Sequence, residues 1–112
     1  MHEYSIAYDL YATSRKTAIE NNARQVKKVS VELGKMAMVN PEQVAFLFDA
    51  IKENDPLFKT TLLQCDEVLP QTRCSCGYSG LEIFVCPMCG ALPELVKGRE
   101  IVVTSVELEV DD

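Results

Sequence analysis

The spacing of apolar and polar positions divides the chain into two helical and three extended segments. In the first helical segment, four residues fall near one another on a helical wheel: Tyr4, Ala7, Tyr11 and Ala18. Ile6 and Leu10 lie beside this stripe, and charged residues lie on the other side. That periodicity predicts an amphipathic helix from about Ser5 to Asn22.

The second helical segment carries a start signal. Asn40 is a favourable N-cap, Pro41 suits the first helical position, and Gln43 stands where a capping box needs it. The apolar residues that follow have helical spacing: Val44, Leu47, Phe48 and Ile51. We therefore expect a helix that starts here and ends near Asn54, before Pro56.

Three further segments show the period of two that is typical of half-buried strands. They run from Val26 to Gly34, from Thr60 to Leu69 and from Ile101 to Val110. In the second of them, Thr61, Leu63 and Cys65 share one face. Residues 101–103 are apolar on both faces, which predicts a strand that is covered on both sides. A short apolar run at residues 83–85 allows one more strand.

Four of the five cysteines form two closely spaced pairs, in Cys74-Ser75-Cys76-Gly77 and Cys86-Pro87-Met88-Cys89-Gly90. Two pairs on tight turns can close four thiolates around one tetrahedral ion, and zinc is the usual ion in a reducing compartment. Gly77 and Gly90 stand where each turn must direct backbone amides toward the sulfurs without a Cβ clash. A single iron would also fit four thiolates, and free or redox-active thiols are a third interpretation.

Four cysteines saturate a tetrahedral ion, so the predicted site is structural rather than catalytic. The remaining cysteine, Cys65, is expected to be a small core residue and not a ligand. Together these segments predict an α+β fold, in which a small three-stranded sheet carries two helices. A zinc-ribbon subdomain is inserted between the second and third strands. Residues 1–69 together with 98–112 form the α/β domain, and residues 70–97 form the zinc-ribbon domain.

Charge narrows the range of functions. The chain has 112 residues and a net charge of -6, which argues against nonspecific binding to nucleic acid and to an anionic membrane. No apolar stretch is long enough to span a bilayer, and the N-terminus lacks the apolar run of a signal peptide. We therefore expect a cytoplasmic protein with reduced thiols.

The first three residues offer several nitrogen ligands. The Met1 α-amine, the His2 backbone nitrogen and the His2 imidazole are close in covalent sequence, and the backbone nitrogen of Glu3 can add a fourth. Such a square-planar nitrogen set suits Ni(II) or Cu(II), and Glu3 can instead supply a carboxylate oxygen. Taken alone, the tripeptide favours a frayed chain end over a metal site.

Short motifs spread along the chain favour the metal site over the frayed chain end. They are Met1-His2-Glu3, Val29-Ser30-Val31-Glu32-Leu33-Gly34, Pro41-Glu42, the cysteine ribbon, Gly98-Arg99-Glu100 with Ile101-Val102-Val103, and Val106-Glu107-Leu108-Glu109. In their order and spacing, the chain resembles the HypA/HybF family of hydrogenase nickel-incorporation proteins over essentially its whole length. The resemblance implies a cytoplasmic nickel metallochaperone without enzymatic activity.

The same resemblance implies the sites and the partners. The nickel site would be Met1, His2 and Glu3, in the α/β domain. The structural zinc site would be Cys74, Cys76, Cys86 and Cys89. The implied partners are a hydrogenase maturation GTPase and the large subunit of [NiFe]-hydrogenase, and in some bacteria urease is a further client. Neither nucleic acid nor membrane is an expected partner. The sequence does not fix the oligomeric state, and a weak homodimer is one option.

Two positions depart from the family's pattern. The family commonly places two residues between its first two cysteines, whereas here only Ser75 separates them, so the first turn must be tighter. Some members carry an acidic residue near the start of the second helix that is implicated in nickel binding. Here that position is Asn40, so either the contact is absent or the residue serves only as a cap.

Two other classes of function compete with the metallochaperone. A zinc-ribbon adaptor for nucleic acid is opposed by the net charge and by the lack of a basic, aromatic face around Arg73 and Tyr78. An enzyme or redox protein would use the thiols or His2. However, the chain has no Ser/His/Asp set, and the carboxylates of Asp66 and Glu67 lie on a predicted strand. A red, reducible iron site would favour electron transfer over structural zinc.

Overall fold

The computed structural model describes residues 3–111, which fold into two compact units. The first, which we call the helical unit, comprises residues 3–31, 39–65 and 103–111. The second, the ribbon unit, comprises residues 32–38 and 66–102. The chain therefore passes between the units several times, and residues distant in sequence belong to the same unit.

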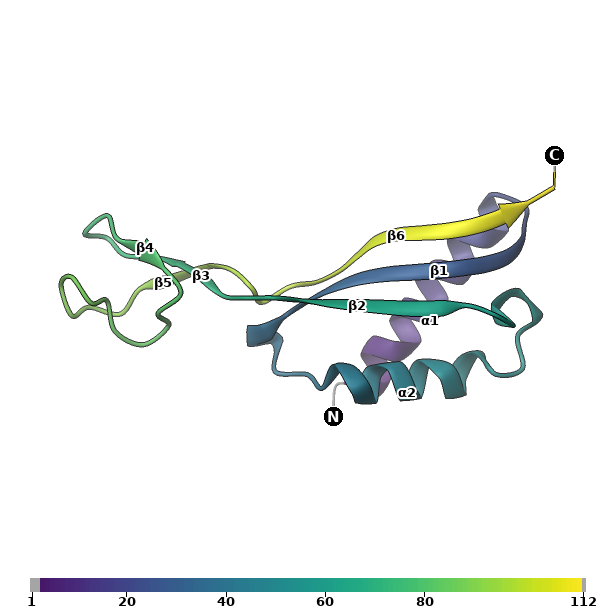
Figure 1. Cartoon of the computed structure of the whole chain (residues 1–112), viewed down its shortest axis with the longest axis horizontal. Coiled ribbons are helices and arrows are strands. Elements are labelled where there is room, and N and C mark those ends of the chain that lie inside the picture. The colour runs from purple at the N-terminus through teal and green to yellow at the C-terminus, as the bar shows by residue number, and fades with distance from the viewer. Residues whose placement is uncertain (1–2, 112) are drawn as a thin grey trace. The chain divides into compact units, whose positions relative to one another are not determined.

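Two helices and two small sheets make up the fold (Figure 1). In chain order the elements are α1 (Glu3–Glu20), β1 (Ala23–Gly34), α2 (Pro41–Lys52), β2 (Leu62–Val68), β3 (Gln71–Arg73), β4 (Ser79–Gly80), β5 (Glu94–Lys97) and β6 (Ile101–Val110). Short 3-10 helices follow β1 at Lys35–Ala37 and α2 at Pro56–Phe58. The sheets have the orders β2-β1-β6 and β4-β3-β5. The predicted α+β class, with two helices on a three-stranded sheet and a separate cysteine ribbon, is confirmed.

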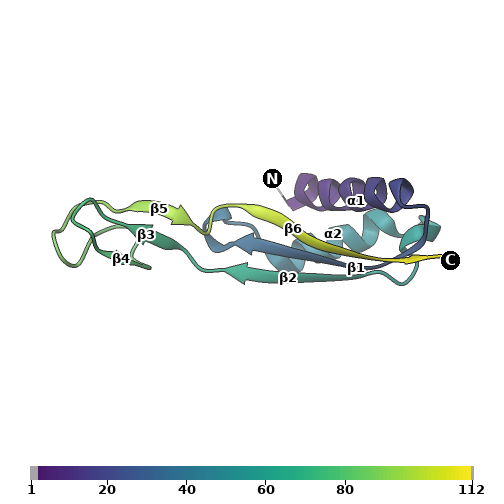
Figure 2. The ribbon, with the colours of Figure 1, turned by 90° about the horizontal axis from the view of Figure 1, so that it is seen from above.

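In the helical unit, α1 and α2 lie on the same face of the sheet, as Figure 2 shows together with Figure 1. The central strand β1 contributes Val26, Val29 and Val31, all fully buried. Phe48 of α2 and Phe58 lie edge to face, with ring centroids 6.1 Å apart, and close this core. The half-buried strand predicted from Val26 onward is therefore confirmed, although β1 starts three residues earlier.

Helix α1 begins at Glu3, two residues before its predicted start. Its buried residues have the spacing of one helical face: Ala7, Leu10, Ser14 and Ala18. Most of these side chains are small, so the helix can approach its neighbours closely. The Ser14 hydroxyl donates to the Leu10 carbonyl at 2.6 Å and is thereby satisfied. Tyr4, which the predicted stripe included, is 50% exposed.

Helix α2 has the predicted start. The Asn40 side chain accepts hydrogen bonds from the backbone amides of Glu42 and Gln43, at 2.9 and 3.2 Å. Pro41 occupies the first helical position, where its missing N–H has no consequence. The apolar stripe buries Val44 and Phe48 completely.

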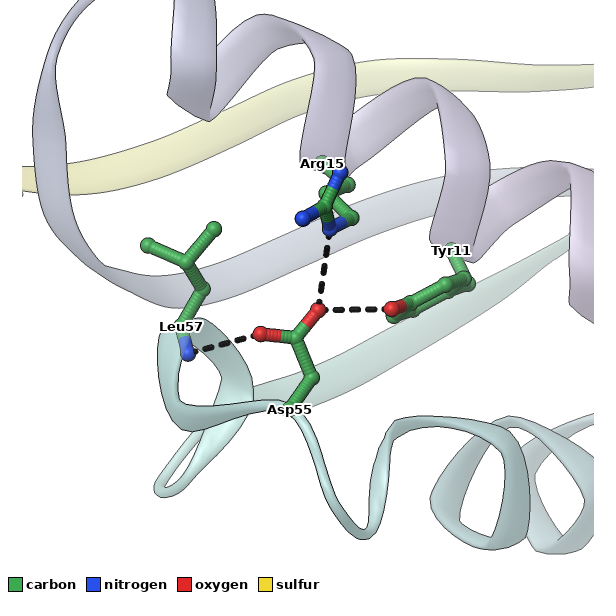
Figure 3. A network of polar contacts seen from close by, with 4 residues as sticks. All are labelled: Tyr11, Arg15, Asp55 and Leu57. Carbon is green, nitrogen blue, oxygen red and sulfur yellow. Dashed lines mark hydrogen bonds and ion pairs between the residues drawn. The ribbon is translucent and has the colours of Figure 1, made fainter.

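A polar cluster fixes the end of α2 against α1 (Figure 3). The Asp55 carboxylate accepts hydrogen bonds from the Tyr11 hydroxyl at 2.6 Å and from Arg15 Nε at 3.2 Å. It also accepts the backbone amide of Leu57 at 2.9 Å. Burial raises the pKa of Asp55, but the hydrogen bonds from Tyr11, Leu57 and Arg15 outweigh it and hold the pKa below its usual range.

Two predictions about the extended segments were wrong. Strand β6 has the predicted bounds, but Val102 is 47% exposed, so this strand is not covered on both faces. The apolar run at residues 83–85 forms no strand, and Phe84 and Val85 lie exposed in a loop. The strands that the ribbon does contain, β3, β4 and β5, are two to four residues long. Elements this short carry no readable periodicity.

Within the ribbon unit, the end of β1 is hydrogen-bonded to the backbone of residues 98–100. The amide of Gly34 donates to the Glu100 carbonyl at 2.8 Å, and the amide of Met36 donates to the Gly98 carbonyl at 2.8 Å. A Cβ on Gly34 would overlap the carbonyl of Gly98. Gly98 itself has φ +107, which only glycine adopts readily.

Candidate metal centre

Four thiols converge in the ribbon unit. The sulfurs of Cys74, Cys76, Cys86 and Cys89 all lie within 4.8 Å of one another. The Sγ atoms of Cys74 and Cys89 are 3.4 Å apart, and those of Cys76 and Cys86 are 3.6 Å apart. Zinc–sulfur bonds of about 2.3 Å would place tetrahedral ligands about 3.8 Å apart. The spacing of the thiols therefore fits a single tetrahedral ion.

The two cysteine turns close by equivalent backbone bonds despite their different lengths. In the second turn, the Gly90 amide donates to the Cys86 carbonyl at 2.8 Å, and the Cys86 amide donates to the Ala91 carbonyl at 2.8 Å. In the first turn, the Gly77 amide donates to the Cys74 carbonyl at 2.9 Å, and the Cys74 amide donates to the Tyr78 carbonyl at 2.7 Å. The first turn has one residue fewer between its cysteines, yet it closes with the same two kinds of backbone hydrogen bond.

Both glycines have the conformation that the sequence predicted. Gly77 has φ +101 and Gly90 has φ +76, and both values lie in the region that disfavours side chains with a Cβ. Neither glycine has an atom within 4 Å of the position of a Cβ, so the requirement is conformational and not one of space.

Backbone amides two residues further along the chain act on the sulfurs. The Met88 amide donates a hydrogen bond to Cys86 Sγ at 3.4 Å. The amides of Cys76, Tyr78 and Ala91 each act to lower the pKa of the thiol two residues earlier, at Cys74, Cys76 and Cys89 respectively. Such bonds stabilise the thiolate form, which is the form that binds a metal ion. The sequence signalled these donors only through the glycines that shape the turns.

The thiols also influence one another. The amide of Cys76 and the thiol of Cys89 lower the pKa of Cys74 to about 6. The Ala91 amide opposes the change at Cys89, but hydrogen bonds with Cys74 and Cys76 raise the pKa of Cys89 to about 12. Four thiolates this close repel one another, so full deprotonation needs a cation among them. A divalent ion would supply that charge.

This donor set suits zinc as a structural ion, because four thiolates leave no position open for water or substrate. Among residues 3–111, this is the one group of three or more Cys, His, Asp or Glu side chains placed to hold a metal. Cys65 is not part of it, in agreement with the prediction that it is not a ligand. It is only partly buried, so it is less of a core residue than expected.

A buried threonine that sequence reasoning missed supports the loop before the second cysteine pair. Thr72 on β3 is 2% exposed, and its hydroxyl lies 2.8 Å from the Glu82 carbonyl and 3.1 Å from the Gly80 carbonyl. It anchors the loop whose other end carries Cys86. Nothing in the sequence distinguishes Thr72 from other strand threonines.

At the other predicted site, Met1 and His2 lie outside the described residues. Glu3 is described, and its carboxylate Oε2 accepts a hydrogen bond from the backbone amide of Asn40 at 3.3 Å. The structure therefore brings the first residue of α1 to the N-terminus of α2. Sequence reasoning singled out Glu3 and Asn40 separately but did not predict this bond.

Comparison with known proteins agrees with this architecture. Residues 1–108 match the family model described as hydrogenase/urease nickel incorporation, metallochaperone, hypA. The hydrogenase maturation factor HypA of Methanocella arvoryzae is 40% identical over 114 residues, which cover 98% of this chain and 100% of that protein. HypA of Aquifex aeolicus is 34% identical over 115 residues, with 99% and 100% covered.

A solved structure has the same fold. The solution structure of the Ni metallochaperone HypA from Helicobacter pylori superposes with a TM-score of 0.74 at 23% identity, covering 99% of this chain and 100% of that one. The fold and the thiol cluster define a small α+β protein with a cysteine ribbon whose four thiols are placed to hold a metal ion. The chain belongs to the HypA family of nickel-incorporation metallochaperones. No helix among residues 3–111 is both long and apolar enough to cross a membrane.

Proposed function

We propose that this protein binds Ni(II) through Met1, His2 and Glu3 and delivers it during the maturation of [NiFe]-hydrogenase. Zinc bound by the four ribbon cysteines would be a structural ion. The observation that carries the nickel site is the family match, because residues 1–108, which include Met1, His2 and Glu3, match a family model for nickel incorporation. These three residues also offer an amine, two backbone nitrogens and an imidazole, a nitrogen set that suits Ni(II).

The resulting site is a square-planar set of four nitrogens: the Met1 amine, the backbone nitrogens of His2 and Glu3, and the His2 imidazole. Two of these ligands become anionic when their amide protons leave. The positive ends of the dipoles of α1 and α2 lie close by, because Glu3 and Asn40 are hydrogen-bonded. That local field favours the deprotonated amides.

Glu3 would bind nickel through its backbone nitrogen. Its carboxylate would not be a ligand and would instead hold the residue in place. The bond from the Asn40 amide holds the carboxylate against the start of α2. The Asn40 side-chain oxygen is engaged by two helix amides and is neutral, so it adds no ligand. In this chain, the acidic contact found in some relatives would be absent.

The partners follow from membership of the family. Relatives carry the name hydrogenase maturation factor, and the family model names both hydrogenase and urease. We infer a maturation GTPase and the nickel-free large subunit of [NiFe]-hydrogenase as partners in the cytoplasm, with nickel as cargo and no catalytic turnover. No feature of the described residues favours urease over hydrogenase as the client.

Genetic replacement tests the delivery step. A host strain that lacks its own copy of this gene should lose hydrogenase activity at low nickel and regain it with the wild-type gene. His2→Ala should fail to restore activity at low nickel, and excess nickel should partly rescue it. A matched surface variant, Lys16→Ala, should behave as the wild type. Full restoration by His2→Ala at low nickel would refute delivery from the N-terminus.

A further inference from the structure

The loops around the four cysteines are almost free of charged side chains. Residues 74–93 contain one charged residue, Glu82, and no Lys, Arg or His, whereas 25% of the whole chain is charged. The Tyr78 hydroxyl donates to the Glu82 carboxylate at 2.9 Å, so even this charge is engaged. The nearest basic residues along the chain, Arg73 and Lys97, lie in strands β3 and β5.

The same loops expose large apolar side chains. We call these residues the ribbon tip: Leu81, Phe84, Val85, Met88 and Leu92. Phe84 is 75% exposed, Met88 73% and Leu92 76%. They fall within twelve residues of sequence, held by Thr72 near one end and by the second cysteine turn near the other. Exposed apolar residues this close in sequence, with Glu82 as the one charged residue among them, are typical of the centre of an interface.

The cysteines add a feature that selects the partner. Cys74 and Cys86 are buried, whereas Cys76 and Cys89 are exposed. Four thiolates around a divalent ion leave two negative charges uncompensated. No basic side chain in these loops offsets them, and the backbone amides offset them only in part. With a divalent ion bound, the exposed Cys76 and Cys89 would therefore add negative charge to the loops that carry the apolar ribbon tip.

We propose that the ribbon tip docks a protein segment in which an arginine or lysine is flanked by apolar side chains. The cation would lie over the thiolates of Cys76 and Cys89, and the apolar neighbours would pack on Phe84, Met88 and Leu92. A second copy of this chain is disfavoured, because it would bring together two such negative sites on chains that each carry a net charge of -6. The inference rests on the zinc part of the proposed function and not on the nickel site.

The proposed preference for a basic residue flanked by apolar side chains can be tested with a peptide-display library. The library is panned on the zinc-loaded full-length protein. The double variant Phe84→Ser/Met88→Ser serves as the counter-selection target, after metal analysis has shown that it keeps its zinc. We expect enrichment of peptides that carry Arg or Lys between apolar residues. Such a peptide should bind the double variant at least about tenfold more weakly than the wild type. Its affinity should fall with added salt and on replacement of its basic residue by Ala.

Phe46→Ser is the matched control, because Phe46 is 72% exposed but lies on α2 in the helical unit. It should bind the selected peptides within about twofold of the wild type. The proposal is overturned if panning enriches nothing over the double variant, or if it enriches peptides without a basic residue. It is also overturned if sedimentation shows a dimer that only the double variant loses, or if the ribbon tip binds neutral lipid vesicles instead. Loss of zinc from the wild type on purification would refute the zinc site itself, which is a separate failure.

Discussion

The backbone amide of Asn40 donates a hydrogen bond to the Glu3 carboxylate, over 3.3 Å, and so ties the first residue of α1 to the start of α2. Because the donor is a backbone group, the bond does not depend on the identity of the side chain at position 40. Glu3, the described residue of the proposed nickel site, is thereby held at the start of α2.

Glu3→Gln separates the two ways in which Glu3 could bind nickel. The variant keeps the backbone nitrogen and an oxygen that can accept the Asn40 amide, but it removes the carboxylate charge. If the site consists of nitrogens alone, isothermal titration should give a nickel affinity within about threefold of the wild type, since a carboxylate oxygen is not a ligand. A much larger loss would show that the carboxylate binds the metal.

Cysteine substitution tests the ribbon. Purified protein should contain one zinc per chain, and Cys86→Ser should release it, because three thiolates no longer enclose the ion. Cys65→Ser, the matched control, should keep its zinc because Cys65 lies outside the cluster. Metal analysis by mass spectrometry measures both. Equal zinc loss in the two variants would contradict the assignment of the ligands.

Removal of the Asp55 charge should destabilise the helical unit. Asp55→Asn weakens hydrogen bonds from Tyr11 and Arg15, and we expect a loss of about 1–3 kcal/mol in the free energy of unfolding at neutral pH. Tyr11→Phe removes one of these bonds and should have the smaller effect. Urea denaturation followed by circular dichroism measures both variants.

The contribution of Asp55 should also depend on pH. The folded-state pKa lies below the ordinary value of 3.8, so the carboxylate stabilises the fold above that value. The contribution is lost as the pH falls through the folded pKa, where the native state must also take up the proton. The stability difference between wild type and Asp55→Asn should therefore be constant near neutrality and shrink below about pH 4. A difference that stays constant down to pH 2 would contradict this mechanism.

Gly34 lies so close to the Gly98 carbonyl that a side chain at position 34 should destabilise the fold. Gly34→Ala would place a Cβ against the Gly98 carbonyl, so backbone must shift, and we expect a loss of about 1–3 kcal/mol. Gly77→Ala is the comparison, because its Cβ would meet open space and the penalty is only that of φ +101. Thermal unfolding of the zinc-loaded variants should place Gly34→Ala lower than Gly77→Ala. The reverse order would mean that the contact relaxes easily.

Local signals in the sequence were sufficient for the larger elements. The Asn40–Pro41 start of α2 and the bounds of β6 were predicted because capping chemistry and two-residue alternation act within a few residues. The cysteine cluster was predicted for the same reason, since ligand spacing and the following glycines are local features.

Other features depend on contacts between distant residues. The burial of Thr72 and the bond from Asn40 to Glu3 join segments that have no shared local pattern. The exposure of Val102 depends on what covers strand β6, and an apolar run alone does not reveal it. The apolar run at residues 83–85 allowed a short strand, whereas the structure leaves Phe84 in an exposed loop.

Binding of nickel at the N-terminus through the Met1 amine can be tested by a single titration. Nickel is added to zinc-loaded protein in three forms: with a free Met1 amine, with one extra residue before Met1, and as His2→Ala. We predict a yellow-orange, diamagnetic complex with the first form only, and an affinity that rises with pH because the ligands release protons. Equal nickel affinity in all three forms would contradict the account and would place the nickel elsewhere on the protein.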